Sequence, residues 1–128
     1  MSVRNVLIVD DDPYTRERLA KILEAEGYVV ETAASAADGY ARCAKAPSRY
    51  GLVFMDVHFP RGAVGFTIAR QIAGLRDFGG PHVIGMTGHS DLYNYDRRDE
   101  NGMIDVILKP LHAHLVTRLA AGHFRSAA

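Results

Sequence analysis

Short apolar runs recur along the chain, and four of them end directly in polar residues that can carry chemistry. The polar residues that follow these runs are Asp10 with Asp11, Asp56, Thr87 and Lys109. Runs this short, without polar alternation, are typical of strands buried on both faces of a parallel sheet. The carboxyl ends of parallel strands share one edge, where open α/β sheets bind their ligands. The sequence therefore predicts a site of three carboxylates, a hydroxyl and an ammonium.

Segments with helical spacing separate the apolar runs. A predicted helix follows each predicted strand, and these strands cover residues 6–9, 28–32, 52–57, 83–86 and 105–108. The first helix begins at Pro13 behind Asp12 and ends near Gly27, whereas Ser35 and Pro47 bound the second. This alternation indicates an α/β fold, with a doubly wound parallel sheet of five strands and right-handed crossovers.

Helical spacing also predicts which residues face the sheet. The expected inward residues are Ala37, Tyr40, Ala41 and Ala44 in the second helix, and Leu111, Leu115, Val116 and Leu119 in the last. Residues 91–101 are different, because they offer only Leu92 and two tyrosines as apolar candidates. We therefore expect an atypical fourth helix, either short or loosely docked.

Length and composition narrow the class of protein. The chain has 128 residues, which suits a single domain over residues 1–128, and its zero formal net charge argues against direct binding to nucleic acid. Cys43 is the only cysteine, so we expect it to pack in the core of a protein in a reducing compartment. The sequence opens with no export signal and has no membrane-spanning run, so we expect a cytoplasmic location.

The predicted cluster of side chains suits a divalent cation and a phosphoryl group. Carboxylates at the ends of adjacent strands repel one another, and oxygen ligands of this kind favour Mg²⁺ or Mn²⁺. Asp56 is the expected nucleophile, since a carboxylate can form an aspartyl phosphate. Lys109 would neutralise the transferred group and Thr87 would donate to one of its oxygens, while Gly88 leaves room for it. We expect Asp12 to cap the first helix rather than to bind metal.

Four motifs together resemble the receiver domains of two-component response regulators, including the chemotaxis-regulator-like ones. They are Val-Asp-Asp-Asp-Pro at residues 9–13, Met-Asp-Val-His-Phe-Pro at 55–60, Met-Thr-Gly at 86–88 and Leu-Lys-Pro at 108–110. The resemblance spans nearly the whole chain. It implies a flavodoxin-like (βα)5 fold with the strand order 2-1-3-4-5.

The resemblance also implies roles for individual residues. Asp10, Asp11 and the backbone carbonyl of His58 would bind Mg²⁺ together with Asp56. Asp56 would accept phosphate from a histidine kinase or a histidine phosphotransfer protein, while Thr87 and Lys109 would contact the phosphoryl group. The peptide bond between Lys109 and Pro110 would be cis.

This chain departs from the receiver pattern at three places. Val106 stands where receivers commonly have Tyr or Phe, so a ring cannot rotate inward there. Residues 97–101 are polar and charged where similar proteins have alanines, which fits the atypical fourth helix. His58 and His89 flank the expected path of the hydrolytic water, so we predict that they tune the phosphoryl lifetime.

Three classes of function are considered, of which the sequence favours the first, keeps the third as the alternative and argues against the second. The first is a phosphorylation switch that catalyses only its own phosphorylation and dephosphorylation, and that changes a surface read by a downstream protein. The second is a metal-dependent phosphatase, which generally needs an acid where His58 stands and a cap over its substrate. The third is a phosphorylation-independent pseudo-receiver. The sequence leaves open whether the chain acts alone or belongs to a larger protein.

Overall fold

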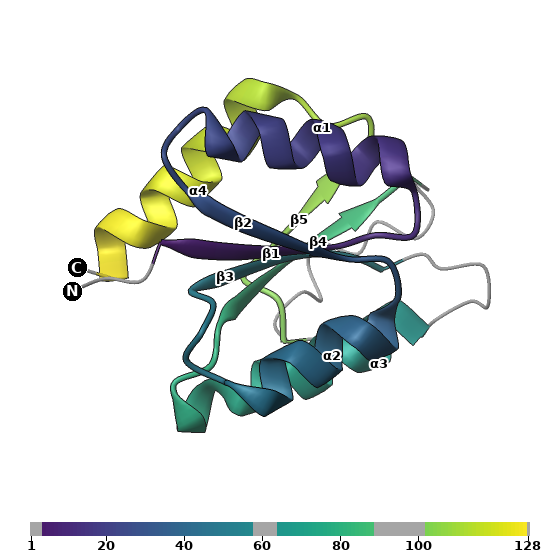
Figure 1. Ribbon diagram of the computed structural model, residues 1–128, viewed down its shortest axis with the longest axis vertical. Coiled ribbons are helices and arrows are strands. Elements are labelled where there is room, and N and C mark those ends of the chain that lie inside the picture. The colour runs from purple at the N-terminus through teal and green to yellow at the C-terminus, as the bar shows by residue number, and fades with distance from the viewer. Residues whose placement is uncertain (1–3, 58–63, 89–101, 128) are drawn as a thin grey trace.

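The computed structural model describes residues 4–57, 64–88 and 102–127, which form a five-stranded parallel sheet with helices on both faces (Figure 1). The strand order is β2-β1-β3-β4-β5, as expected from the sequence. The strands are β1 (Asn5–Val9), β2 (Val29–Ala33), β3 (Leu52–Asp56), β4 (His82–Thr87) and β5 (Asp105–Leu108). Their positions match the five predicted strands to within one residue at every end.

Within the part of the chain that the structure describes, two α-helices cover each face of the sheet. The helices are α1 (Pro13–Glu24), α2 (Ala36–Lys45), α3 (Val64–Ala73) and α4 (Ala113–Ala127), and the 3₁₀ helix η1 (Gly74–Phe78) follows α3. In Figure 1, α1 and α4 lie on one face, and α2 and α3 lie on the other. Residues 91–101, for which the sequence predicts an atypical fourth helix, lie outside the described residues.

Each face of the sheet has its own hydrophobic core, because the strands alternate their side chains between the two faces. Leu7, Val9, Val53 and Met55 contribute to the core under α2 and α3. Val6, Ile8, Leu52 and Phe54 contribute to the core under α1 and α4. All eight are fully buried. Apolar runs without polar alternation are therefore explained by burial on both faces.

The register of the sheet brings the ends of its central strands together. Val9 pairs with Met55, so Asp10 and Asp56 each follow directly after a paired position. Asp56 in turn pairs with Met86, and Thr87 pairs with Leu108. The residues after Val9, Met55, Met86 and Leu108 consequently lie at one edge, as the sequence predicts.

The predicted inward face of α2 is wrong by one position. Ala37, Ala41 and Ala44 are exposed, and the residues that face the sheet are Ala36, Gly39 and Cys43. Gly39 explains why this face of α2 lies against the sheet, because a Cβ atom added there would lie 2.7 Å from Cγ2 of Val9. The helix approaches β1 so closely that only glycine fits at this point. Tyr40 is half-buried against the same core, as expected.

The predicted face of the last helix is correct in part. Val116 is fully buried, Leu119 is partly buried, and Leu111 is buried just before the helix begins. Leu115 is 39% exposed, contrary to the prediction, because the buried stripe of α4 runs through Val116, Ala120 and Phe124. These three residues are four apart, which places Leu115 at the border of the stripe.

Cys43 lies in the core, as its position in an alanine-rich helix predicts. It is fully buried and forms no disulfide. Burial raises the pKa of its thiol to about 12, so the side chain is a neutral packing group at physiological pH.

Candidate functional site

Three carboxylates meet at the carboxyl edge of the sheet. Asp10 follows β1 and is fully buried, Asp56 ends β3 and is 2% exposed, and Asp11 is exposed. One carboxylate oxygen from each lies within 4.8 Å of the others. Buried carboxylates are costly unless they are paired with charge or hydrogen-bonded. Two buried acids at this distance therefore indicate a site that holds positive charge.

Asp10 is fixed by hydrogen bonds to its side chain and its backbone. Its Oδ1 accepts from the backbone N–H of Asp12 at 2.9 Å, and its Oδ2 accepts from Nζ of Lys109 at 2.7 Å. The backbone N–H of Asp10 donates to Ala33 on β2, and its carbonyl accepts from the Arg16 guanidinium at 2.8 Å. This carboxylate is consequently held in one orientation.

Lys109 supplies the positive charge. Its Nζ atom lies 2.7 Å from Oδ2 of Asp10 and 3.6 Å from Oδ2 of Asp56. Burial lowers the pKa of Lys109, but the hydrogen bond to Asp10 and the charges of both carboxylates outweigh that effect and leave the pKa raised. The ammonium therefore stays charged and links the acids of two adjacent strands. The Lys109–Pro110 peptide bond is cis, as the resemblance implies.

Thr87 and Gly88 occupy the end of the neighbouring strand. Thr87 is fully buried, and its carbonyl accepts a hydrogen bond from the backbone N–H of Lys109 at 2.7 Å. A Cβ atom built on Gly88 would meet nothing within 4 Å, so space is open beside the threonine. This agrees with the expectation that Gly88 leaves room for an added group.

Asp12 caps α1 instead of joining the acidic cluster, as expected. Its carboxylate accepts from the backbone N–H groups of Tyr14 and Thr15 and from the Thr15 hydroxyl at 2.6 Å. The hydrogen bond from the Thr15 side chain is the main reason that the pKa of Asp12 is lowered. The cap fixes the start of α1 directly beside Asp10 and Asp11.

The acidic cluster fits a small divalent cation. Two ligands on opposite sides of a Mg²⁺ ion are about 4.2 Å apart, given metal–oxygen distances of about 2.1 Å. The three carboxylates already lie within 4.8 Å of one another, and the exposed side chain of Asp11 can adjust. An all-oxygen set with room for water suits Mg²⁺ or Mn²⁺ rather than zinc.

The structure thus brings together most of the residues that the sequence singles out. Asp10, Asp11, Asp56 and Lys109 form one cluster, and Thr87 ends the adjacent strand. Val106 is 2% exposed and packs in the core under α2 and α3. His58, with its proposed carbonyl ligand, and His89 lie outside the described residues, so their roles stay predictions.

Two arginines of α1 contribute to the site and were not anticipated from the sequence. Arg16 donates to the carbonyl of Asp10, and Arg18 donates to the carbonyl of Leu111, two residues after Lys109. The only signal in the sequence is their position in the first two turns of a helix that begins beside the acids. A long arginine side chain can reach several carbonyl groups, so that position alone does not select one.

Comparison with known proteins identifies the family. Residues 6–120 match the family described as the response regulator receiver domain. The chain belongs to this family. The match covers all five strands except Asn5 of β1, and it includes Asp10, Asp11, Asp56 and Lys109.

Individual relatives support the same assignment. The chain is 36% identical over 120 residues to the transcriptional regulatory protein AruR of Pseudomonas aeruginosa, covering 91% of this chain and 48% of that protein. It is 32% identical over 110 residues to the acid tolerance regulatory protein ActR of Rhizobium meliloti, covering 86% of this chain and 54% of that protein. The receiver domain therefore spans about half the length of these curated relatives.

A solved receiver structure has the same fold over nearly the whole chain. The crystal structure of a CheY-like response regulator receiver domain protein from Methanospirillum hungatei JF-1 superposes with a TM-score of 0.82 and 28% identity. The match covers 98% of this chain and 96% of that one. Within its described part, the receiver domain has no helix that combines the length and apolar character needed to cross a bilayer.

Proposed function

We propose that Asp56 is the phosphoacceptor of this receiver domain and that its phosphorylation switches a protein-interaction surface. The observation that carries the proposal is the position of Lys109, whose ammonium lies 2.7 Å from Asp10 and 3.6 Å from Asp56. Asp56 thus presents a buried carboxylate next to a fixed positive charge, at the edge where a second acid is already held. Little else accounts for a partly buried lysine between two buried aspartates at this edge.

The proposed reaction is a displacement at phosphorus. A carboxylate oxygen of Asp56 forms a bond to the phosphorus atom of the donor, and the bond from phosphorus to its leaving group breaks. The leaving group is the imidazole of a phosphohistidine, which departs as a neutral ring because its other nitrogen already carries a proton, or acetate when acetyl phosphate is the donor. Lys109 stabilises the negative charge of the transferred group, and Thr87 donates to one of its oxygens.

Mg²⁺, or Mn²⁺ in its place, belongs to this proposal. Asp10, Asp11 and Asp56 would hold the cation, with the His58 carbonyl as a further ligand. The cation would supply charge neutralisation at the phosphoryl oxygens. Oδ2 of Asp10 already accepts a hydrogen bond from Lys109. A cation bound at that oxygen would displace the ammonium, which could then interact with Asp56.

The switch would start at Thr87. A phosphoryl group adds a charge of about −1.5 to −2, to which a threonine hydroxyl and a lysine can form charge-assisted hydrogen bonds. Movement of Thr87 would pull the end of β4 and the residues that follow Gly88. Val106 pairs with Gly85 and is buried, so this chain would transmit the change through the backbone of residues 87–101 rather than through an aromatic ring.

The partners follow from the same reaction. Response regulator relatives imply a phosphodonor protein and a downstream target, and we propose a histidine kinase or histidine phosphotransfer protein as the donor. The domain would catalyse only its own phosphorylation and dephosphorylation. A cytoplasmic location, supported by the single reduced cysteine, is part of this proposal.

Labelling with a small phosphodonor tests the proposal. The purified domain is incubated with acetyl phosphate with and without Mg²⁺, and phosphoprotein is measured for the wild type and for Asp56→Ala. We expect Mg²⁺-dependent labelling that is absent from Asp56→Ala. Equal labelling of both proteins would contradict the assignment, and no labelling of either would favour the phosphorylation-independent module. Continuous turnover of a generic phosphate ester would favour a phosphatase.

A further inference from the structure

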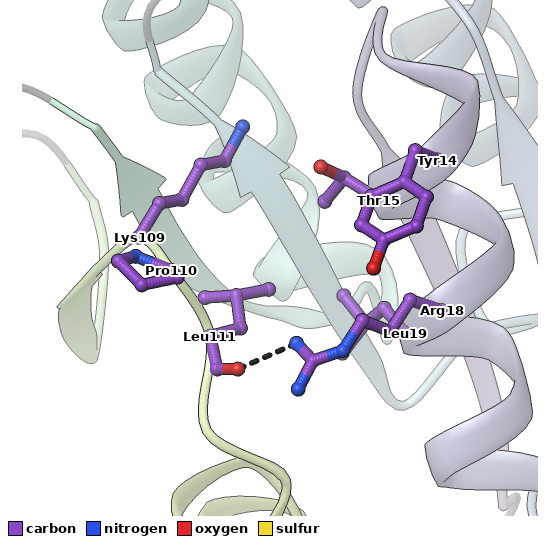
Figure 2. A pocket seen from close by; sticks show the side chains of 7 residues that line it. All are labelled: Tyr14, Thr15, Arg18, Leu19, Lys109, Pro110 and Leu111. Carbon is purple, nitrogen blue, oxygen red and sulfur yellow. Dashed lines mark hydrogen bonds between the residues drawn. The ribbon is translucent and has the colours of Figure 1, made fainter.

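The segment that carries Lys109 is attached to the rest of the domain on two sides. The backbone N–H of Lys109 donates to the carbonyl of Thr87, which anchors it to β4. Two residues later, the carbonyl of Leu111 accepts a hydrogen bond from the guanidinium of Arg18 on α1, as Figure 2 shows. This second bond joins residues 93 positions apart in the sequence. It is a charge-assisted bond, which is stronger than one between neutral groups.

Packing between α1 and this segment is incomplete. A cavity of about 80 Å³ lies between them, and Figure 2 shows its lining of Tyr14, Thr15, Arg18, Leu19, Lys109, Pro110 and Leu111. Beneath the cavity, Leu19 and Leu111 are buried in the core. The cavity is partly open to solvent. The hydrogen bond from Arg18 therefore connects the helix and the segment where side-chain packing is interrupted.

We infer that Arg18 is a positioning residue for Lys109. By holding Leu111 against α1, it fixes the backbone two residues after the lysine, while Thr87 fixes the backbone at the lysine itself. The ammonium can then reach Asp10 and Asp56, which are carried by β1 and β3. The inference rests on the proposed function of Asp56, since the position of the ammonium matters for chemistry only where a phosphoryl group is received.

The chemistry of arginine suits this role. A guanidinium stays charged at any pH at which proteins are stable, and its several donors keep a carbonyl bonded through small movements. Arg18 is exposed on the helix surface, so its replacement leaves both cores intact. Methionine is a good helix former of similar length without a donor, which makes Arg18→Met a specific test of the hydrogen bond.

The first measurement is the rate of Asp56 labelling by acetyl phosphate. A small donor is used because a change on the surface of α1 would also alter contacts with a protein donor. We expect Arg18→Met to label about tenfold more slowly, as loss of one charge-assisted hydrogen bond predicts. Arg18→Lys, which keeps a charged donor, should recover part of the rate. Lys21→Met is the matched control, because Lys21 is an exposed cation one turn further along α1.

A second readout separates positioning from general destabilisation. If the ammonium no longer competes for Oδ2 of Asp10, Mg²⁺ should bind Arg18→Met more tightly although labelling is slower. A variant that is merely less stable would bind Mg²⁺ more weakly and also label more slowly. Isothermal titration measures the affinity of each variant for Mg²⁺, and a melting curve measures its stability.

Amide hydrogen exchange tests the inference without any phosphodonor. We expect the Lys109 amide, which donates to the Thr87 carbonyl, to exchange faster in Arg18→Met than in the wild type and in Lys21→Met. Unchanged exchange and unchanged labelling would overturn the positioning role, and so would equal effects of Arg18→Met and Lys21→Met. Faster exchange in a domain that acetyl phosphate does not label would contradict the proposed function and leave the positioning of Lys109 in place.

Discussion

Lys109 interacts with both buried acids of the site. Its ammonium lies nearer to Asp10, the expected metal ligand, than to Asp56, the expected phosphoacceptor. Lysine and cation would therefore compete for Oδ2 of Asp10 before phosphorylation. Once the cation is bound, the same lysine would assist the transfer at Asp56. One side chain thus has opposite effects on two steps.

Replacing Lys109 by methionine should separate these effects. We expect Lys109→Met to label with acetyl phosphate about a hundredfold more slowly, because removal of one charged stabilising group from a preorganised site typically costs that much. The same variant should bind Mg²⁺ about tenfold more tightly, a modest part of the roughly 4 kcal/mol between two unit charges 4 Å apart near a protein surface. Labelling rates and isothermal titration measure the two changes.

The opposite signs make this prediction specific. Lys21→Met again serves as a control, because Lys21 is exposed and pairs only with Glu17 among the contacts of the described residues. A Lys109→Met protein that binds Mg²⁺ more weakly than the wild type would contradict the proposed competition. If Lys109→Met labels at the wild-type rate, Lys109 takes no part in the transfer of the phosphoryl group.

At the scale of elements, the packing of α2 on β1 positions the strand that leads into Asp10. Val9 is the last residue of β1, is fully buried and contacts α2 at Gly39. Valine is stiff about χ1, so it cannot easily turn away from an added methyl group. The close approach of helix and strand therefore depends on the missing side chain at residue 39.

Gly39→Ala should destabilise the domain even though alanine favours helices. The added Cβ would lie 2.7 Å from Cγ2 of Val9, and overpacking of this kind costs about 1 to 3 kcal/mol. Gly122→Ala on α4 is the matched control, since its Cβ would meet nothing within 4 Å and should stabilise by about 0.5 to 1 kcal/mol. Urea unfolding measures the change in stability of each variant. Equal stabilisation by the two substitutions would show that α2 does not pack on Val9 as described.

At the scale of the whole molecule, a pair of histidines adds to the apolar packing of α4 on the sheet. The rings of His82 on β4 and His123 on α4 are 4.8 Å apart and edge-on. Burial is the main cause that lowers the pKa of both, and the charge of Arg76 acts in the same direction. Both histidines are therefore favoured in the neutral form in the folded domain.

This pair predicts how stability depends on pH. Because the folded-state pKa values lie below the usual 6.5, the unfolded chain binds more protons, and stability is lost as pH falls below that value. Urea unfolding at about pH 7.5 and about pH 5.5 should show the domain less stable at the lower pH. His123→Gln, which cannot titrate, should reduce the difference. If the stability of His123→Gln depends on pH as strongly as that of the wild type, other titratable groups cause the pH dependence.

Much of this molecule could be predicted from the sequence, because parallel strands buried on both faces appear as uninterrupted apolar runs. The residue after each run then marks the edge of the sheet, which is why the positions of Asp10, Asp56 and Lys109 could be predicted together. The cap at Asp12 could also be predicted, since its partners are local in the chain.

Other features depend on contacts that the sequence does not contain. In α2, alanine, glycine and cysteine differ little in hydropathy, so periodicity could not show that the face with Gly39 would meet Val9. The bond from Arg18 to Leu111 depends on how far α1 lies from the segment after β5. Both features follow from how the elements are placed in three dimensions.

Locating the phosphoryl group tests directly whether Asp56 is the phosphoacceptor. The wild-type domain, labelled with acetyl phosphate and Mg²⁺, is digested and its peptides are examined by mass spectrometry. We expect one modified site, Asp56, and a loss of the modification when Mg²⁺ is chelated during labelling. A phosphoryl group on another residue, or an unmodified Asp56 under these conditions, would contradict this expectation.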